Sequence, residues 1–163
     1  MNAQEIAALV DRHGPPLVLY ARQRCSMPED VVQEAFLKLV TQSRWPSKVI
    51  PWLYRVVRNA ARDLNKSQYR RQQRERSVAR ATRWFVEPEI EGLDAEVAVA
   101  ALHRLPIDQR EVIVARLWGG LSFEVIGEIA GCSASTAFRR LEAGIDALRK
   151  ELRITCQNPT SKS

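Results

Sequence analysis

The chain has 163 residues, and its 25 lysines and arginines outnumber its 19 acidic residues, which gives a formal net charge of +6. This length allows one domain or two small ones, and the positive charge favours a polyanionic partner such as nucleic acid. The three cysteines lie far apart without a CxxC pair, which argues against a disulfide scaffold and a zinc site and indicates a reducing cytoplasm. No apolar run approaches the roughly 18 residues of a membrane span, and no signal segment is visible, so we expect no membrane insertion.

Residues 1–68 are predicted to form a first helical domain. A helical stripe begins at Ile6, is interrupted by Pro15 and Pro16, and resumes over residues 17–24. Ser26 is expected to cap the next helix, with Pro28 in its first turn. The side chains that this helix is expected to bury are Val32, Ala35, Phe36, Leu39 and Val40.

The clearest helical periodicity in the chain follows a loop. Apolar residues recur from Trp52 to Leu64 on one face of a long helix. The opposite face is polar and mainly basic, with Arg55, Arg58, Asn59, Arg62, Asp63 and Lys66. The pattern therefore predicts one face in the core and one basic face in solvent, with Trp52 in the core.

Residues 69–93 show no sustained apolar stripe. A basic block is followed by an acidic block, which is typical of a charged linker that is partly helical near the preceding helix. Some 20 residues could extend over about 60–70 Å, enough to separate two DNA-binding parts by about one and a half to two duplex turns.

Residues 94–153 are predicted to form a second compact helical unit, followed by a disordered tail at 154–163. A helix is expected to open at Asp108 and to end at Gly119 and Gly120. The residues expected in the core of this unit are Val112, Ile113, Leu117, Ala137, Leu141, Ile145, Leu148 and Leu152. The whole chain is thus predicted to be all-α, with two small helical domains.

The end of the second unit has the pattern of a helix-turn-helix. Ser122 is expected to cap the short helix FEVIGEIA, Gly131 to form a turn with positive φ, and Ser133 to cap a longer helix. In this motif the first helix braces the second, whose N-terminal residues enter the major groove of DNA. The residues predicted to contact DNA are Ser133, Ser135, Thr136, Phe138, Arg139 and Arg140. The alternative is an ordinary three-helix packing unit with solvated arginines.

Three stretches occur in one order: DVVQEAFLKLV, then PWLYRVVRNAARDLNKSQYRR, then LPIDQREVIVARLWGGLSFEVIGEIAGCSASTAFRRLEAGIDALRKEL. Together they resemble the extracytoplasmic-function class of bacterial sigma factors, and the resemblance covers residues 6–152. It implies a first domain that binds core RNA polymerase and melts the minus-ten promoter element, and a last domain that reads the minus-thirty-five element. Many relatives are held by an anti-sigma factor, which the resemblance adds as a further partner.

The resemblance assigns expected roles to residues of the first domain. The polymerase-binding positions are Asp30, Gln33, Glu34, Leu37 and Lys38, for which a plain solvated helix face is the alternative. The minus-ten positions are Arg55, Arg58, Asn59 and Arg62, with Trp45 and Lys48 in the preceding loop. Unpaired bases and their backbone need a cationic groove and stacking surfaces, which these residue types can supply.

Three further arginines are expected to contact the DNA backbone. Arg70 and Arg71 match phosphate contacts, although a merely solvated charge run is the alternative. In the last domain, the resemblance adds Arg116. Where many relatives carry Gly-Thr-Val and a basic residue, this chain has Ser135-Thr136-Ala137-Phe138 followed by two arginines, so no promoter sequence is predicted.

No catalytic centre is predicted. His13 and His103 are isolated from any Ser, Cys or carboxylate at catalytic spacing, and no Gly-rich phosphate loop occurs, so we expect neither enzymatic activity nor a cofactor. Two alternatives to a sigma factor remain open. One is a helix-turn-helix regulator that binds operator DNA by itself, and the other is a protein-interaction module whose basic faces bind acidic proteins.

Overall fold

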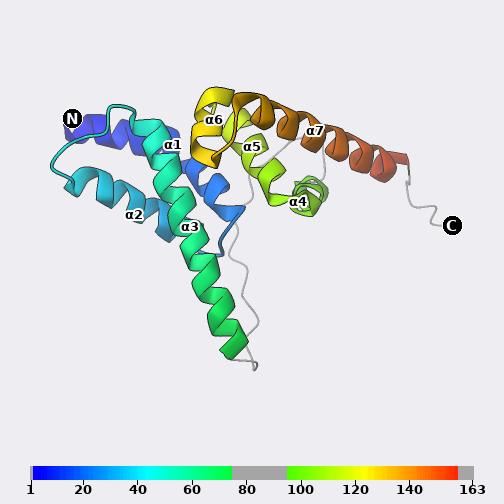
Figure 1. The fold of residues 1–163 in the computed structure, drawn as a ribbon, viewed down its shortest axis with the longest axis horizontal. Coiled ribbons are helices and arrows are strands. Elements are labelled where there is room, and N and C mark those ends of the chain that lie inside the picture. The colour runs from blue at the N-terminus through cyan, green and yellow to red at the C-terminus, as the bar shows by residue number, and fades with distance from the viewer. Residues whose placement is uncertain (1, 75–94, 158–163) are drawn as a thin grey trace.

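The computed structural model describes residues 2–74 and 95–157, and within these residues the chain forms seven helices and no strand (Figure 1). The predicted all-α fold class is confirmed. The parts of the predictions that fall on residues 1, 75–94 and 158–163 lie outside the described residues. The helices are α1 (Ala3–Arg22), α2 (Pro28–Thr41), α3 (Val49–Arg74), α4 (Ala95–Arg104), α5 (Ile107–Leu117), α6 (Phe123–Ala130) and α7 (Ala134–Gln157).

Helices α1, α2 and α3 form the first unit, in which each helix contacts the other two. Their core contains the apolar stripe predicted for α3, with Leu53 and Val57 fully buried. Trp52 is partly buried and packs against this core, as expected. Tyr54, which the stripe did not include, is also fully buried and lies edge-on to Tyr20, with 5.0 Å between the ring centroids.

Helices α4 to α7 form the second unit. Helix α5 contacts both α6 and α7, and α4 packs against α7. Only the C-terminal end of α7 extends beyond the other helices of the unit (Figure 1). Four residues of α7 that were expected in the core are only partly buried: Leu141, Ile145, Leu148 and Leu152. Helix α7 also continues to Gln157, into the stretch that was expected to be disordered.

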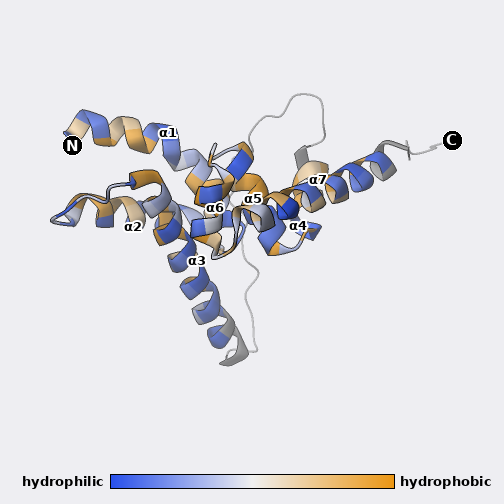
Figure 2. Cartoon of the chain, turned by 45° about the horizontal axis from the view of Figure 1, so that its top comes forward, coloured by the Kyte–Doolittle hydropathy of each residue, from blue (hydrophilic) through white to orange (hydrophobic). Residues whose placement is uncertain are grey.

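The two units pack against each other. Helix α1 contacts α5, α3 contacts α6, and one continuous cluster of buried residues includes members of both units. Figure 2 shows hydrophobic residues gathered where the helices meet, and mainly hydrophilic residues along the free end of α3. The linker left the relative placement of the two units open, and in this conformation they form one body.

Several helix ends and buried positions differ from the sequence-based expectations. Helix α1 runs through Pro15 and Pro16, and its buried residues all follow these prolines. Helix α2 has Pro28 in its first turn as expected, but Met27 takes the N-cap position. The Ser26 hydroxyl instead donates a hydrogen bond to the Gln68 side chain on α3, at 3.1 Å.

Two apolar side chains that were expected in the core are exposed. Val40 on α2 is 39% exposed and Leu117 at the end of α5 is 57% exposed. Both lie in the last turn of a helix and line surface grooves, Val40 between α1 and α2, and Leu117 beside α1 and α3. Helix α5 also begins at Ile107, one position before the expected Asp108, because Pro106 fixes the N-cap conformation.

Candidate nucleic-acid interface

The turn between α6 and α7 has the geometry predicted for a helix-turn-helix. The Ser122 hydroxyl accepts a hydrogen bond from the Val125 N–H at 3.3 Å, and Gly131 ends α6 with φ +71°. The Ser133 hydroxyl accepts from the Thr136 N–H at 3.1 Å and so caps α7. The turn is tight, because a Cβ atom on Gly127 would lie 2.5 Å from the Cys132 carbonyl oxygen.

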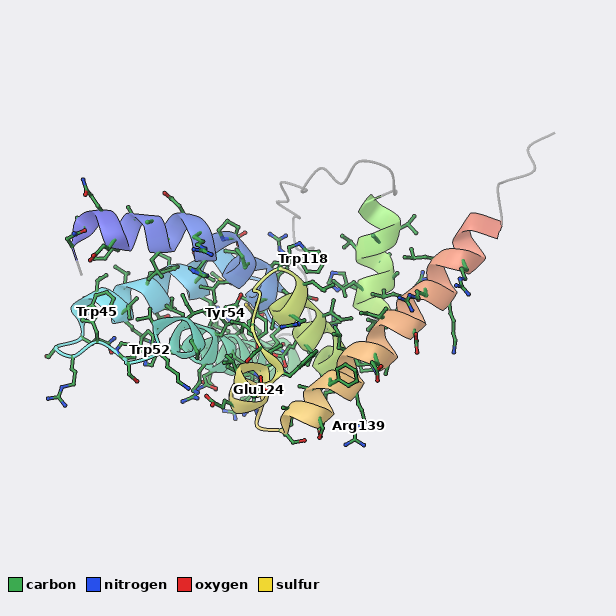
Figure 3. All side chains as sticks on the ribbon, turned by 90° about the horizontal axis from the view of Figure 1, so that it is seen from above. Trp45, Trp52, Tyr54, Trp118, Glu124 and Arg139 are labelled. Atoms are coloured by element: carbon green, nitrogen blue, oxygen red, sulfur yellow. The ribbon has the colours of Figure 1, made fainter. Side chains whose placement is uncertain are left out.

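The N-terminal turns of α7 present polar side chains to solvent. Ser133, Ser135 and Arg139 are exposed, and Thr136 is half-buried. The three hydroxyls form one cluster, with Ser133 Oγ 3.1 Å from Ser135 Oγ and 2.8 Å from Thr136 Oγ1. The Arg139 side chain points away from the body of the molecule (Figure 3). This end of α7 therefore has the exposure that reading a DNA groove requires.

Phe138 is 44% exposed, but one side of its ring packs against α6. Its ring meets the Phe123 ring edge-on, with 5.4 Å between centroids. The Arg116 guanidinium lies 4.8 Å from the centroid of Phe123 and donates a hydrogen bond to the Leu121 carbonyl oxygen at 2.8 Å. Arg116, predicted as a DNA backbone contact, thus also joins the end of α5 to the start of α6.

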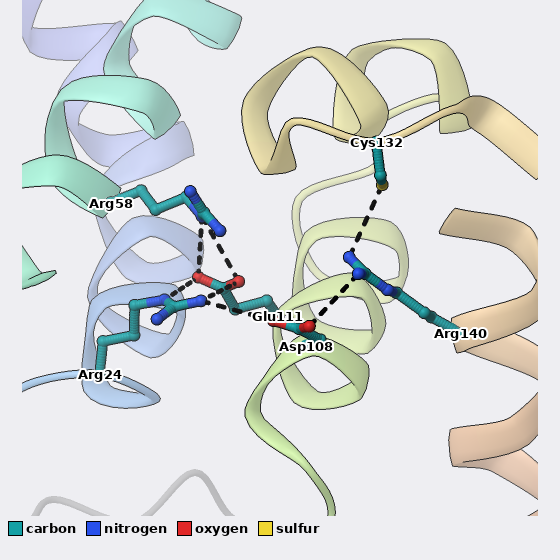
Figure 4. Close-up of polar contacts among 6 residues, drawn as sticks. All are labelled: Arg24, Arg58, Asp108, Glu111, Cys132 and Arg140. Atoms are coloured by element: carbon teal, nitrogen blue, oxygen red, sulfur yellow. Dashed lines mark hydrogen bonds and ion pairs between the residues drawn. The ribbon is translucent and has the colours of Figure 1, made fainter. Parts of the chain in front are cut away.

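Arg140 points in a different direction from Arg139. Its guanidinium lies 3.3 Å from the Asp108 carboxylate on α5 and 3.6 Å from the Cys132 sulfur (Figure 4). Adjacent residues on a helix point about 100° apart, which accounts for the difference. In this conformation Arg140 joins α7 to α5, and Arg139 is the arginine of the pair that faces solvent.

The basic face predicted on α3 is present, apart from one residue. Arg55, Asn59 and Arg62 are exposed, as are Arg70 and Arg71 nearer the end of the helix. Arg58 is the exception, because its side chain is only 12% exposed and its Nε lies 3.3 Å from a Glu111 carboxylate oxygen on α5. In this conformation Arg58 is therefore not accessible to DNA, contrary to the expectation of a solvent-facing residue.

The loop before α3 holds the two other minus-ten positions. Trp45 is half-buried and packs against the core of the first unit (Figure 3). Lys48 is exposed, and its Nζ lies 4.0 Å from the Glu128 carboxylate on α6. The loop is thus near the second unit as well as α3.

Sequence reasoning missed the group that joins the two units. Glu111 is 2% exposed, and its carboxylate accepts hydrogen bonds from both Arg24 and Arg58, with Arg24 Nη2 at 2.6 Å from Oε2 (Figure 4). The hydrogen bond with Glu111 raises the pKa of Arg24. The available signal was that Glu111 precedes the buried Val114 and Ala115 by three and four residues, which places a carboxylate on an apolar helix face.

The residues predicted to bind polymerase share one exposed face of α2. All five are exposed: Asp30, Gln33, Glu34, Leu37 and Lys38. Glu34 and Lys38 form an ion pair at 2.7 Å, and Leu37 is 55% exposed. Leu37 borders a groove of about 440 Å³ between α1 and α2 that is lined almost wholly by apolar groups, including Ile6 and Val10. An exposed apolar groove with a polar rim is typical of a protein-binding surface.

In the described part of the chain, no cluster of three or more His, Cys, Asp or Glu side chains is arranged to hold a metal ion. Among the same residues, no helix combines the length and apolar character needed to cross a membrane. Cys25 is buried and Cys132 is half-buried, and both are free thiols. Burial raises the pKa of Cys25.

Two family models match this chain in sequence order. Sigma-70 region 2 matches residues 9–75, and Sigma-70, region 4 matches residues 96–148. The first match begins within α1 and covers α2 and α3, and the second includes the helix-turn-helix. The chain thus carries both regions, one in each unit of the fold.

Several curated proteins are similar to the chain. The ECF RNA polymerase sigma-E factor of Haemophilus influenzae is 34% identical over 127 residues, which cover 69% of this chain and 67% of that protein. The RNA polymerase sigma factor CarQ of Myxococcus xanthus is 30% identical over 88% of this chain and 87% of its own length. A probable RNA polymerase sigma factor, RfaY of Xanthomonas campestris, is 30% identical over 76% of this chain, but the match spans only 34% of that protein.

Two solved structures share the fold. The sigma factor RpoE, in complex with the anti-sigma factor NepR from Bartonella quintana, superposes with a TM-score of 0.75 at 25% identity, over 93% of this chain and 96% of that chain. CnrH, in complex with the cytosolic domain of CnrY, superposes with a TM-score of 0.64 at 24% identity, over 94% of this chain and 90% of that chain.

Proposed function

This chain belongs to the extracytoplasmic-function class of the sigma-70 family of RNA polymerase sigma factors, and we propose that it binds core RNA polymerase and directs it to specific promoters. The observation that carries the proposal is the presence of region 2 and region 4 in one chain, each on its own helical unit. A DNA-binding regulator needs only the second unit. The first unit adds a basic helix and an exposed mixed apolar and polar face.

The polymerase contact is assigned to α2 and the groove beside it. Asp30, Gln33, Glu34 and Lys38 supply a charged and polar rim, and Leu37 supplies an exposed apolar side chain next to the groove. Interfaces of this kind gain affinity from apolar side chains at the centre and orientation from charges at the rim.

The minus-ten element is assigned to the basic face of α3 and the loop that precedes it. Arg55, Asn59 and Arg62 are exposed on this helix, and Lys48 is exposed in the loop. Arginines track the phosphates of a melted strand, whereas unpaired bases stack on flat side chains. Trp45 is the candidate for such stacking, and Arg70 and Arg71 would extend the backbone contact along α3.

The minus-thirty-five element is assigned to the N-terminal turns of α7. Arg139 is exposed and can donate two hydrogen bonds to the edge of a guanine, and Phe138 can contact a thymine methyl group. The capped N-terminus, with Ser133, Ser135 and Thr136, suits a phosphate. Arg140 and Arg116 complete this surface, although here both also make contacts within the second unit.

The domain boundaries, cellular location and further partner complete the proposal. We infer that residues 1–68 act as the minus-ten and polymerase domain, residues 69–93 as the linker and residues 94–153 as the minus-thirty-five domain. Core polymerase and promoter DNA act in the bacterial cytoplasm, and that is where we place the chain, without cofactor or catalysis of its own. Because the structural neighbour RpoE was solved in complex with an anti-sigma factor, an anti-sigma factor is the expected inhibitory partner.

The test is reconstitution with purified core polymerase. We expect the chain to co-elute with core enzyme in gel filtration, and to yield run-off transcripts from genomic promoter fragments that core enzyme alone does not produce. Absence of any chain-dependent transcript would refute the proposal. Tight operator binding without affinity for core enzyme would indicate a stand-alone helix-turn-helix regulator. Failure to bind DNA even at low salt would indicate a protein-interaction module.

A further inference from the structure

Three basic residues that the sequence resemblance or the helix-turn-helix pattern predicted to contact DNA face acidic residues of the second unit. Arg58 on α3 pairs with Glu111, Lys48 in the loop before α3 lies 4.0 Å from Glu128, and Arg140 pairs with Asp108 at 3.3 Å. The first two pairs connect the first unit to the second. Carboxylates of the second unit therefore occupy positions where DNA phosphates would be expected.

The Glu111 contact is the most enclosed of these pairs. The side chains of Arg24 and Arg58 are 15% and 12% exposed, and that of Glu111 is 3% exposed. Arg24 uses both Nε and Nη2, one to each carboxylate oxygen, and Arg58 Nε lies 3.3 and 3.4 Å from the same two oxygens. Two guanidinium groups, one on α3 and one in the turn after α1, thus converge on one anion (Figure 4).

The position of this pair relates it to the DNA surface. Arg58 lies three residues after Arg55 and four before Arg62, which puts it in the same row on α3 as these two exposed arginines. Arg24 lies just beyond the end of α1, and its guanidinium lies beside that of Arg58 because both bind the same carboxylate. In this conformation, α5 covers the middle of the basic face. Glu111 makes the closest contact, and Asp108 Oδ1 lies 3.8 Å from Arg24 Nη2.

We propose that Arg24 and Arg58 together form a binding site for one backbone phosphate of promoter DNA, and that Glu111 fills this site when the two units are packed together. The inference rests on the proposed function. A guanidinium fork recognises carboxylate and phosphate oxygens by the same geometry, so the two anions are interchangeable as ligands. DNA and the second unit then compete for one site.

The competition accounts for the packed arrangement of the two units. A chain that holds its units together cannot also place them on two promoter elements about one and a half to two duplex turns apart. DNA binding therefore requires Glu111 to leave the arginine pair, and the population of separated units limits the apparent affinity. Arg24, which no sequence pattern singled out, becomes a DNA-binding residue once Glu111 has moved away.

The experiment measures DNA affinity of the full chain without polymerase. Fluorescence anisotropy with a labelled single-stranded DNA of mixed sequence is recorded at several KCl concentrations. The variants are Glu111→Gln, and Glu111→Gln combined with Arg24→Gln. The matched controls are Asp146→Asn, an exposed acid of α7 that pairs with Arg149, and Arg12→Gln in the Glu111→Gln background, an exposed arginine on α1.

We expect Glu111→Gln to bind DNA at least about threefold more tightly than the natural chain, because the competing anion is gone, and Asp146→Asn to change affinity less than about twofold. Adding Arg24→Gln should then weaken binding at least about threefold and reduce the salt slope by about 0.7, the value for one phosphate of a single strand. Arg12→Gln should have a smaller effect on both quantities.

Two results would overturn the proposal. One is unchanged affinity in Glu111→Gln. The other is equal affinity of Glu111→Gln with and without Arg24→Gln, which would show that Arg24 serves only to hold Glu111. If circular dichroism shows that Glu111→Gln loses helix, the Arg24→Gln comparison is made in the Glu111→Ala background, which also removes the competing carboxylate and places a strong helix former in α5. Run-off transcription by the natural chain tests the proposed function separately from this inference. Its failure would refute the proposed function, whereas the DNA affinities of the variants test only the arginine site.

Discussion

The close contact at Gly127 leads to a quantitative prediction about the helix-turn-helix. A Cβ atom on this residue of α6 would lie 2.5 Å from the Cys132 carbonyl oxygen and 3.3 Å from the Ala134 nitrogen. Both neighbours are backbone atoms of the turn, which is also held by the hydrogen bond from the Cys132 N–H to the Gly127 carbonyl at 3.0 Å. Gly127→Ala therefore forces α6 and α7 apart.

The size of the effect follows from two opposing contributions. Alanine is favoured over glycine in a helix interior by about 1 kcal/mol. Overpacking in a close-packed site costs about 1–3 kcal/mol, and we take the upper value because backbone atoms cannot rotate away as a side chain can. The net loss is about 2 kcal/mol in the free energy of unfolding, which for a chain of this length lowers Tm by about 4–8 °C.

The assay is thermal unfolding followed by circular dichroism, with Gly144→Ala as the matched control. Gly144 is also a buried glycine inside a helix of the second unit, but its added Cβ would meet the Ile113 Cδ1 methyl at 2.8 Å, a side-chain atom that can move. We expect Gly144→Ala to stay within about 1 kcal/mol of the natural chain. Two results would refute the reasoning. One is a Tm of Gly127→Ala that is equal to or above that of the natural chain, and the other is a smaller decrease in Tm for Gly127→Ala than for Gly144→Ala.

Four further predictions follow from exposed and buried side chains. Arg139→Ala should weaken binding to minus-thirty-five duplex by about 1–3 kcal/mol and relax preference at one base pair; an equal loss on random DNA would contradict base reading. Leu37→Asp should lower the affinity for core polymerase at least about tenfold in a binding titration, whereas Val99→Asp, at another exposed apolar position on α4, should not. Tyr54→Phe should leave the free energy of unfolding unchanged or raise it by up to about 1 kcal/mol, because the buried Tyr54 hydroxyl has no hydrogen-bond partner among the described residues. Burial raises the pKa of the Cys25 thiol above its ordinary value of 9.0. The free energy of unfolding should therefore decrease as pH rises from about 9 through that raised pKa, because the unfolded chain releases the thiol proton more readily than the folded chain. Cys25→Ser should reduce this decrease in urea titrations above pH 9.

Local chemical signals were sufficient to predict the helix-turn-helix. Ser122 and Ser133 cap their helices, and Gly131 adopts the positive φ that the pattern required. Each of these features depends on residues within a few positions in the sequence, so the sequence contains the information directly. The long helix α3 was predicted for the same reason, since its periodicity spans many turns.

The packing between the two units could not be predicted in this way. Arg58 belongs by periodicity to the exposed face of α3, but Glu111, which is distant in the sequence, covers it. Leu117 continues the apolar stripe of α5, but it is exposed at the last turn and borders a groove shared with α1 and α3. Arg140 likewise faces Asp108 on a neighbouring helix. Such positions depend on where separate helices meet, which no local pattern specifies.

The two prolines inside α1 make one wall of the apolar groove adaptable. Pro15 and Pro16 have no N–H to donate, so the helix lacks two of its internal hydrogen bonds at this point and bends there more readily than elsewhere. The residues that anchor α1 in the core, Leu17 and Tyr20, come after the prolines, while Ile6 and Val10 line the groove before them. The first half of α1 can therefore tilt relative to the anchored second half, and this tilt changes the width of the groove.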